Sequence, residues 1–198
     1  MESEIKINGS QDDGRSLKKE RTGFIADLLD WLKTIAVTIA VVVLIFTFVA
    51  KTAIVHGRSM ENTLFERDFL VLWSLFYSPK QGDIVAANCM GLNRPDGEVI
   101  VKRVIAVGGQ TVDIDFSTGT VYVDGEALNE PYIKNATIND EGGFSYPVTV
   151  PEGSYFCMGD NRQHSTDSRD ANVGFIERDD ILGKAVLRIY PFNSITVF

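Results

Sequence analysis

Cysteine and histidine are scarce in this chain, which has two of each among its 198 residues. Two cysteines exclude a disulfide-rich scaffold. Because few ligands remain for a Cys/His zinc site, we expect neither a metal nor an organic cofactor. Basic residues are also outnumbered, with 19 Lys and Arg against 27 Asp and Glu and a net charge of −8. A nucleic-acid-binding protein needs cations to neutralise phosphates, so we expect no nucleic-acid partner.

Charge is absent from residues 34–50 (TIAVTIAVVVLIFTFVA). A helix needs roughly 17–25 apolar residues to cross a bilayer, and this block reaches the lower limit. A buried helix of a soluble protein is disfavoured because the block has no amphipathic period. A cleavable signal is disfavoured because Phe48 or Lys51 would stand at the −3 position of the two conceivable cuts, unlike the usual A-x-A site. We therefore predict a retained transmembrane anchor over residues 30–51.

Basic residues near the two ends of this block predict its orientation. Five precede it and three follow it closely: Arg15, Lys18, Lys19, Arg21 and Lys33 before, and Lys51, Arg58 and Arg67 after. This bias places the N-terminus in the cytoplasm of a single-pass protein of the cell membrane. Residues 1–29 are then a cytoplasmic polar tail, disordered over residues 1–20, and residues 52–198 an extracytoplasmic domain.

The pattern after the anchor changes to short β-branched runs separated by turn residues. We predict strands at residues 69–73, 83–87, 99–107, 112–116, 121–123, 146–150, 154–158 and 184–190. Asp124-Gly125 is a strong signal for a two-residue hairpin turn. Neither an internal repeat nor a βαβ alternation occurs in the sequence. The predicted fold is therefore mainly β, a single transmembrane helix followed by a largely antiparallel, barrel-like domain.

Leu75, Phe76 and Tyr77 form a contiguous apolar run in this β domain. Burial in the core is one interpretation, and a surface that dips into the bilayer is the other. The two cysteines, Cys89 and Cys157, lie in apolar runs. They could pair outside the cell, although buried free thiols are at least as compatible with the pattern.

Ser59 and Lys102 are candidates for catalytic chemistry. Gly57 gives the backbone freedom two residues before Ser59, as a nucleophile on a shaped turn requires, although most loop serines are merely solvated. Lys102 shares one face of its predicted strand with Ile100, Val104 and Ala106. Burial there disfavours the ammonium form, and a base near neutral pH needs a pKa lowered from about 10.4 to roughly 8. The alternative is a lysine that reaches solvent from an edge strand.

Residues 158–170 (MGDNRQHSTDSRD) have the composition of a turn-rich loop. The loop also supplies acids that could hold Arg103 and hydroxyls that could orient a neutral amine. His164 in this loop allows a second hypothesis, a Ser59–His164–Asp triad, although a surface histidine is the simpler interpretation.

Four segments together resemble the boxes of the bacterial type I signal peptidases. They are residues 57–60 (GRSM) with Thr63 and Leu64, residues 82–85 (GDIV), residues 101–104 (VKRV), and residues 159–162 (GDNR) with Ser165, Asp167, Ser168 and Arg169. Their order and spacing, and the preceding anchor, agree with the family. The short interval between the last two boxes resembles the compact members.

The resemblance implies a membrane-bound serine endopeptidase with a Ser/Lys dyad. Ser59 would be the nucleophile, with its N–H as an oxyanion donor, and neutral Lys102 the general base. Ser165 would orient the lysine amine. The ionic support under the site would come from Arg103, Asp160, Asp167 and Arg169. Substrates would be secretory preproteins, cut after small residues at −1 and −3. The partners are then these preproteins and the lipid bilayer, and we expect a monomer.

Some positions depart from the family pattern. Asn62 stands where Pro is usual, Arg67 where Gly is usual, and Gln110 where Asp is common. Gly57 occupies a position at which some members carry a serine as second oxyanion donor. Two alternatives remain open, an inactive anchored relative that binds signal peptides without cutting them and a Ser/Lys protease with one dedicated substrate.

Overall fold

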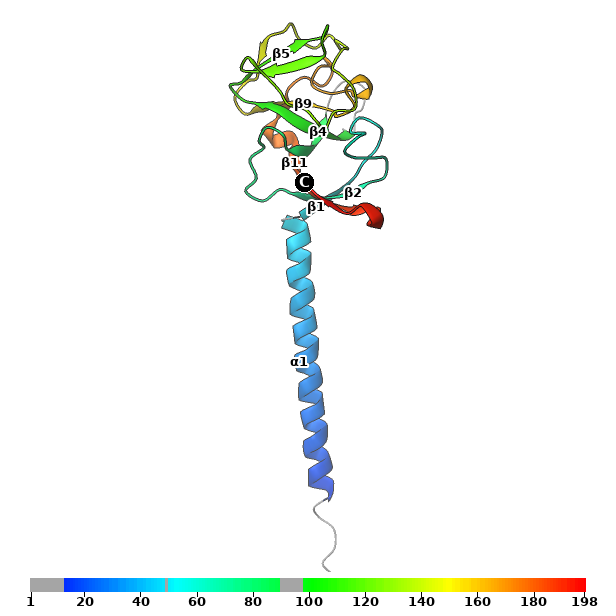
Figure 1. Ribbon diagram of the computed structural model, residues 1–198. Coiled ribbons are helices and arrows are strands. Elements are labelled where there is room, and N and C mark those ends of the chain that lie inside the picture. The colour runs from blue at the N-terminus through cyan, green and yellow to red at the C-terminus, as the bar shows by residue number, and fades with distance from the viewer. Residues whose placement is uncertain (1–12, 49, 90–97) are drawn as a thin grey trace, which may run out of the picture. The chain divides into compact units, whose positions relative to one another are not determined.

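The computed structural model describes residues 13–48, 50–89 and 98–198 (Figure 1). The chain divides into two compact units, Met1–Ile45 and Phe46–Phe198. Helix α1 (Asp13–Phe48) begins within the segment that the composition predicts to be disordered. That prediction is wrong for residues 13–20, whose Leu, Lys, Arg and Glu are good helix formers. The helix ends at Phe48, so the last two residues of the predicted anchor, Ala50 and Lys51, belong to the first strand instead.

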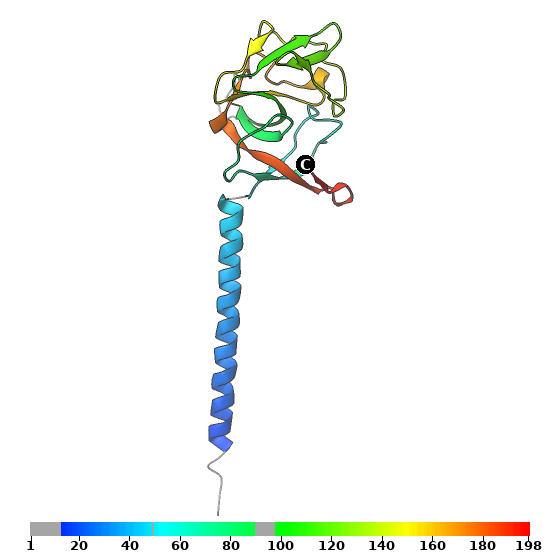
Figure 2. The ribbon, with the colours of Figure 1, turned by 60° about the vertical axis from the view of Figure 1, so that its left-hand side comes forward.

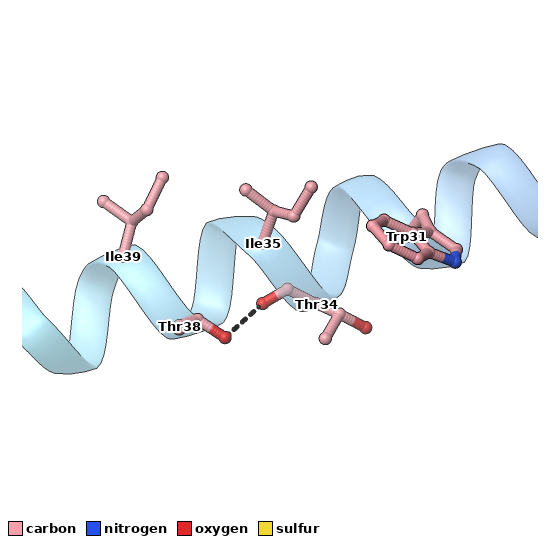
Figure 3. Close-up of a pocket in the computed structure, with 5 residues that line it drawn as sticks. All are labelled: Trp31, Thr34, Ile35, Thr38 and Ile39. Atoms are coloured by element: carbon pink, nitrogen blue, oxygen red, sulfur yellow. Dashed lines mark hydrogen bonds between the residues drawn. The ribbon is translucent and has the colours of Figure 1, made fainter.

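The Thr34 and Thr38 side chains of α1 bond within the helix. Figure 3 shows Thr34 and Thr38 beside Trp31, Ile35 and Ile39. The Thr38 hydroxyl donates to the Thr34 carbonyl at 2.8 Å, and the Thr34 hydroxyl to the Asp30 carbonyl at 2.9 Å. No helix in the described part of the chain combines the length and apolarity that crossing a membrane requires, and the spanning segment therefore remains a prediction.

The second unit contains two antiparallel sheets. The larger sheet has eight strands, β1 (Ala50–Ile54), β2 (Phe69–Trp73), β3 (Ile84–Cys89), β4 (Glu98–Val107), β9 (Ser154–Met158), β10 (Ile176–Glu177), β11 (Ile181–Tyr190) and β12 (Thr196–Val197). The smaller sheet has four, β5 (Thr111–Asp115), β6 (Thr120–Val123), β7 (Glu126–Ala127) and β8 (Val148–Thr149). Three short 3₁₀ helices, η1 (Arg162–His164), η2 (Arg178–Asp180) and η3 (Phe192–Ser194), complete the unit.

The strand order of the larger sheet is β1-β2-β11-β3-β4-β9-β10, with β12 beside β11. Within the described residues this hydrogen-bonded path does not return from β10 to β1, so the prediction of a mainly antiparallel β domain is confirmed without a closed barrel. Figures 1 and 2 both show β5 and its neighbours at the opposite end of this unit from β1 and β2, with β4 and β9 between them.

The predicted strands at residues 69–73 and 154–158 match β2 and β9 throughout. The strand predicted at 146–150 is shorter, because Pro147 has no N–H to donate and the pairing starts at Val148. Asp124 and Gly125 have φ values of 53° and 81°, which suit the predicted hairpin turn. The two-residue strands β10 and β12 escaped sequence analysis because so short a run carries no alternation.

Strand β4 positions Lys102. The pairing of β3 with β4 places Val85 opposite Lys102, on the face of an apolar cluster that includes Val104 and Cys157. The predicted companion Ala106 lies instead in another cluster. The reason is an irregularity in the β4–β9 pairing between Val104 and Ala106, which interrupts the alternation of faces.

The three residues of the apolar run 75–77 differ in their exposure to solvent. Phe76 is 99% exposed, with a φ of 51°. Tyr77 packs against the cluster on the Lys102 face, and its hydroxyl donates to Asp83 at 2.8 Å. Burial raises the pKa of Tyr77, and the bonded Asp83 carboxylate raises it further. Of the three residues, only Phe76 therefore projects fully as an apolar surface residue.

Candidate active site

A cleft of about 240 Å³ opens where the segment after β1 faces the first half of β4. Its lining residues are 54–60, 99–102, His164 and Thr166. Both Ser59 and Lys102 are among them, so the structure brings together two residues that are 43 positions apart in the sequence.

Lys102 Nζ donates a hydrogen bond to Ser59 Oγ at 2.7 Å. Ser59 is half-buried, whereas Lys102 is only 4% exposed. Burial lowers the pKa of Lys102 from its ordinary value, and the nearby Asp167 carboxylate opposes this shift without reversing it. A neutral amine can accept a proton from a hydroxyl at this distance, so the pair has the geometry and electrostatics of a nucleophile and its base.

Ser165 lies next to this pair. It is 7% exposed, and its hydroxyl oxygen has no hydrogen-bond partner within the described residues. The predicted bond from Ser165 to the lysine amine is therefore not formed. Gly159 packs between the two serines, since a Cβ atom at Gly159 would lie 2.2 Å from Ser165 Oγ and 2.4 Å from the Ser59 carbonyl oxygen. Only glycine fits at this point.

Arg103 and Asp160 form a bidentate buried pair. Arg103 Nε and Nη2 donate to the two carboxylate oxygens of Asp160 at 2.8 and 2.7 Å. The remaining Nη1 donates to the Gly82 carbonyl, and the guanidinium carbon lies 4.0 Å from the Tyr132 ring centroid. Thr63 Oγ1 also donates to Asp160 and so connects the pair to the Ser59 segment.

Asp167 and Arg169 form a second, separate pair. Arg169 Nε and Nη2 each donate to Asp167 at 2.9 Å, and both side chains are fully buried. Burial alone would raise the pKa of Asp167, but the bonded Arg169 guanidinium holds it below its usual range. The Gly159 N–H donates to the same carboxylate at 2.9 Å. The four predicted supporting charges are thus brought close to the dyad as two pairs.

Sequence analysis missed the contribution of residues 130–137. Arg162, which is fully buried, donates to Glu130 and to Thr137 Oγ1 in this segment. Asn62 donates to the Tyr132 carbonyl at 3.0 Å from a backbone with φ of 98°. Arg162 belongs to the family-like segment 159–162, but its partners lie in a segment whose sequence carries no alternation or motif.

Glu61 is the centre of a charged group beside Ser59. Arg58 Nε and Lys134 Nζ each donate to its carboxylate at 2.7 Å. These two hydrogen bonds lower the pKa of Glu61 to about 2. The carboxylate is therefore ionised throughout the neutral range and holds the Arg58 side chain at the rim of the cleft.

The remaining candidates have simpler roles. His164 lines the cleft, yet the hydrogen bond of Ser59 Oγ in the described residues is to Lys102. Cys89 and Cys157 are both free thiols, so they do not pair. Burial raises the pKa of Cys157. The parts of the chain that the structure covers contain no group of three His, Cys, Asp or Glu residues suited to a metal ion.

Comparisons with known proteins identify the family of the chain. The family model for signal peptidase, peptidase S26, matches residues 28–190. A signal peptidase I of Bacillus amyloliquefaciens is 35% identical over 190 residues, covering 90% of this chain and 96% of its own. Signal peptidase I P of Bacillus subtilis subsp. natto is 34% identical over 180 residues, covering 86% and 93%.

Among solved structures, a crystal structure of a signal peptidase I from Enterococcus faecalis V583 is 31% identical. It covers 55% of this chain and 97% of its own, with a TM-score of 0.42. Because the family model and the relatives span most of the sequence, the chain belongs to the signal peptidase family, peptidase S26, and is a protease of the signal peptidase I type.

Proposed function

We propose that the chain removes signal peptides from secretory preproteins with a Ser59/Lys102 dyad. The observation that carries the mechanism is the 2.7 Å contact between Lys102 Nζ and Ser59 Oγ, with the lysine buried and its pKa lowered. A lysine that only stabilised the fold would gain nothing from this environment, because burial disfavours its charged form.

In the proposed reaction, Ser59 Oγ attacks the scissile carbonyl carbon while its proton moves to Lys102 Nζ. The carbonyl π electrons move onto oxygen, and the resulting oxyanion accepts a hydrogen bond from the Ser59 N–H. When this intermediate collapses, the C–N bond breaks and the leaving amine takes the proton from Lys102. Water then attacks the acyl-enzyme carbonyl carbon and gives a proton to Lys102. When the acyl C–Oγ bond breaks, Lys102 returns this proton to Oγ, which restores the Ser59 hydroxyl and releases the peptide acid.

The cleft offers an edge for an extended peptide. Strand β4 pairs with β3 from Glu98 onward, whereas its pairing with β9 starts only at Arg103. Within the described residues, the second edge of residues 99–102 therefore has no strand partner, and it lines the cleft opposite residues 54–57. An extended substrate can add to such an edge by main-chain hydrogen bonds, with its side chains pointing alternately into and out of the cleft.

The apolar floor of the cleft supports a preference for small residues. Val55, Met60 and Val101 all line the cleft and are at most 7% exposed. Since these side chains fill the space beneath the substrate edge, alanine-sized residues at −1 and −3 would fit without displacing them.

The supporting residues would act by holding the dyad in place. The Arg103–Asp160 pair is bonded to Thr63, and the Asp167–Arg169 pair is bonded to Gly159. The Ser165 hydroxyl, which has no hydrogen-bond partner among the described residues, would bond the lysine amine or a substrate atom once the cleft is occupied.

We also propose that residues 30–51 anchor the chain in the cell membrane, with residues 1–29 in the cytoplasm and residues 52–198 outside. The uncharged block 34–50 and the basic residues before it support this topology. The bonds of Thr34 and Thr38 to helix carbonyls leave their hydroxyls paired, as a bilayer requires. Alkaline extraction of the full chain from membranes would test the anchor, since release into the supernatant would contradict it. Protease protection in intact cells would test the orientation.

The enzymatic proposal is tested with the full chain in detergent and a preprotein that carries an Ala-x-Ala site. Mass spectrometry would locate the cut, and Ser59→Ala and Lys102→Met would serve as dyad variants. A preprotein with a bulky residue in place of the −1 alanine is the matched substrate control. We expect cleavage after the −1 alanine, reduced by at least about a thousand-fold in either folded variant.

Retained cleavage by a folded Lys102→Met variant would exclude the lysine base and favour His164. Equal cleavage of the control preprotein would exclude the preference for small residues. If the folded wild type cut none of several preproteins, the proposed activity itself would be wrong.

A further inference from the structure

Asn161 lies beneath the Ser59 segment and bonds to it three times. Its backbone N–H donates to the Ser59 carbonyl at 2.9 Å. Its side-chain Nδ2 donates to the Arg58 carbonyl at 3.0 Å and to Glu61 Oε2 at 3.2 Å. Asn161 is only 1% exposed, so these bonds are made away from bulk water. One buried residue therefore fixes the peptide group on each side of the nucleophile, the preceding one through its side chain and the following one through its backbone.

The orientation of the Asn161 amide is fixed by its surroundings. Asn135 Nδ2 donates to Asn161 Oδ1 at 2.9 Å, which gives the oxygen a donor. The nitrogen faces a carbonyl and a carboxylate, both of which only accept. The reversed orientation would set an oxygen against two acceptors, so Asn161 must present its N–H groups to the nucleophile segment.

The bond to the Arg58 carbonyl has a consequence for the neighbouring N–H. The Arg58 carbonyl and the Ser59 N–H belong to one planar trans peptide group, so they point in opposite directions. Holding the carbonyl down towards Asn161 therefore directs the Ser59 N–H away from it. Within the described residues, this N–H donates no hydrogen bond to the protein and is available to a ligand.

We propose that Asn161 is a positioning residue that orients the Ser59 N–H as the oxyanion donor, an inference that rests on the proposed serine mechanism. A hydrogen bond accepted by the carbonyl also polarises the peptide group and strengthens its N–H as a donor. Both effects matter most in the transition state, when negative charge collects on the substrate oxygen. Asn161 itself touches neither substrate nor Lys102 in this role.

The expected effect is smaller than that of losing the donor. Removing an oxyanion donor outright lowers kcat by roughly a hundred- to a thousand-fold. The Arg58 carbonyl would keep a weaker bond from the Glu61 N–H at 3.2 Å after Asn161 is truncated. We therefore expect Asn161→Ala to lower kcat about ten-fold and to change KM by less than about two-fold.

A peptide aldehyde ending in Ala-x-Ala separates this role from a purely structural one. Ser59 Oγ would add to the aldehyde carbon while its proton moves to Lys102 Nζ. The carbonyl π electrons would move onto oxygen, so the adduct carries the charge that the N–H must stabilise. The peptide acid of the same sequence occupies the cleft without this adduct. We expect Asn161→Ala to weaken aldehyde inhibition by the same factor as kcat/KM, while inhibition by the acid stays within about two-fold.

Two further variants complete the experiment. Asn135→Ala removes the bond that orients the Asn161 amide and should cause the same pattern at a smaller amplitude. Gln110→Ala is the matched control, because Gln110 also makes two hydrogen bonds, to Val107 and Asp124, but lies outside the cleft. We expect it to leave kcat and both inhibition constants unchanged.

Unchanged kcat and aldehyde inhibition in a folded Asn161→Ala variant would overturn the proposal. A parallel loss of aldehyde and acid binding would also overturn it, because it would indicate a general distortion of the cleft. If Asn161→Ala did not fold, Asn135→Ala would decide by the same criteria. Failure of the wild type to cut any preprotein would instead reject the serine mechanism, and a normal wild type with unaffected variants would reject only the role of Asn161.

Discussion

Val85 lies directly opposite Lys102 in the antiparallel pairing of β3 and β4, so the lysine amine shares a face of the sheet with an apolar cluster. Burial in this arrangement lowers the pKa of Lys102. The buried lysine therefore lowers the free energy of unfolding of the protein. We expect Lys102→Met to increase the free energy of unfolding at neutral pH, because the methionine has no ammonium charge to lose on burial.

The gain from Lys102→Met should depend on pH in a defined direction. The pKa of Lys102 is ordinary in the unfolded chain, near 10.5, and lower in the folded chain. Between these values the unfolded chain binds more protons, so wild-type stability rises with pH there while the variant lacks this rise. Urea unfolding of both proteins at a series of pH values would measure the difference between their free energies of unfolding. A difference that stays constant up to pH 10.5 would contradict this prediction.

Asp160→Asn should be strongly destabilising. The substitution leaves the Arg103 guanidinium buried without its carboxylate, and breaking a buried pair in this way costs about 3–5 kcal/mol. Lys184→Met is the comparison, since the Lys184–Asp83 pair is more exposed and should contribute less. Equal losses for the two variants in denaturant unfolding would show that burial of the Arg103 pair has no special effect.

Gly159→Ala should reduce activity more than it reduces stability. Its Cβ would lie within 2.4 Å of both Ser165 Oγ and the Ser59 carbonyl oxygen, so the nucleophile segment must move. A displacement of about 1 Å can lower kcat by roughly a hundred-fold. Gly108→Ala provides the control, because its Cβ would crowd the Glu152 Cα atom at 2.9 Å outside the cleft. Preprotein cleavage by Gly159→Ala at the rate of the control would refute this expectation.

Arg67→Gly should stabilise the protein. Arg67 adopts a φ of 68°, a left-handed conformation that costs a residue with a Cβ roughly 1–2 kcal/mol. Glycine avoids that cost but loses part of the gain through its more flexible unfolded state, which leaves a net increase of about 0.5–1 kcal/mol. Arg67→Ala keeps the Cβ and should give no such increase. Thermal unfolding of the two variants side by side would reveal whether the backbone is the cause.

The β pattern could be predicted from local alternation, and the dyad could be predicted because its segments resemble the motifs of a known family. Alternation located β2 and β9, and the motifs identified Ser59 and Lys102 as the pair that the structure brings within 2.7 Å. Contacts to segments that carry no motif could not be predicted. The bonds of Arg162 to Glu130 and Thr137 depend on how residues 130–137 fold back, and the side-chain role of Asn161 depends on the same folding.

The effect of the departures from the family pattern could also be seen only from the backbone conformation. Asn62, which stands in place of the usual proline, has a φ of 98° that proline cannot adopt, since its ring fixes φ near −65°. Its amide instead binds the Tyr132 carbonyl. A tertiary contact thus takes the place of the rigidity that proline would give this turn. No local sequence pattern predicts this contact.

Among the described residues, the edge of β4 that lines the cleft at residues 99–102 has no strand partner, and this has a cost outside catalysis. Main-chain groups that await an extended substrate are equally able to pair with any other extended chain, including a partly unfolded copy of this protein. The substrate-free protein should therefore be the form most prone to aggregation. A peptide that occupies this edge would act as a solubilising agent as well as an inhibitor, so its presence during purification should increase the yield of dispersed protein.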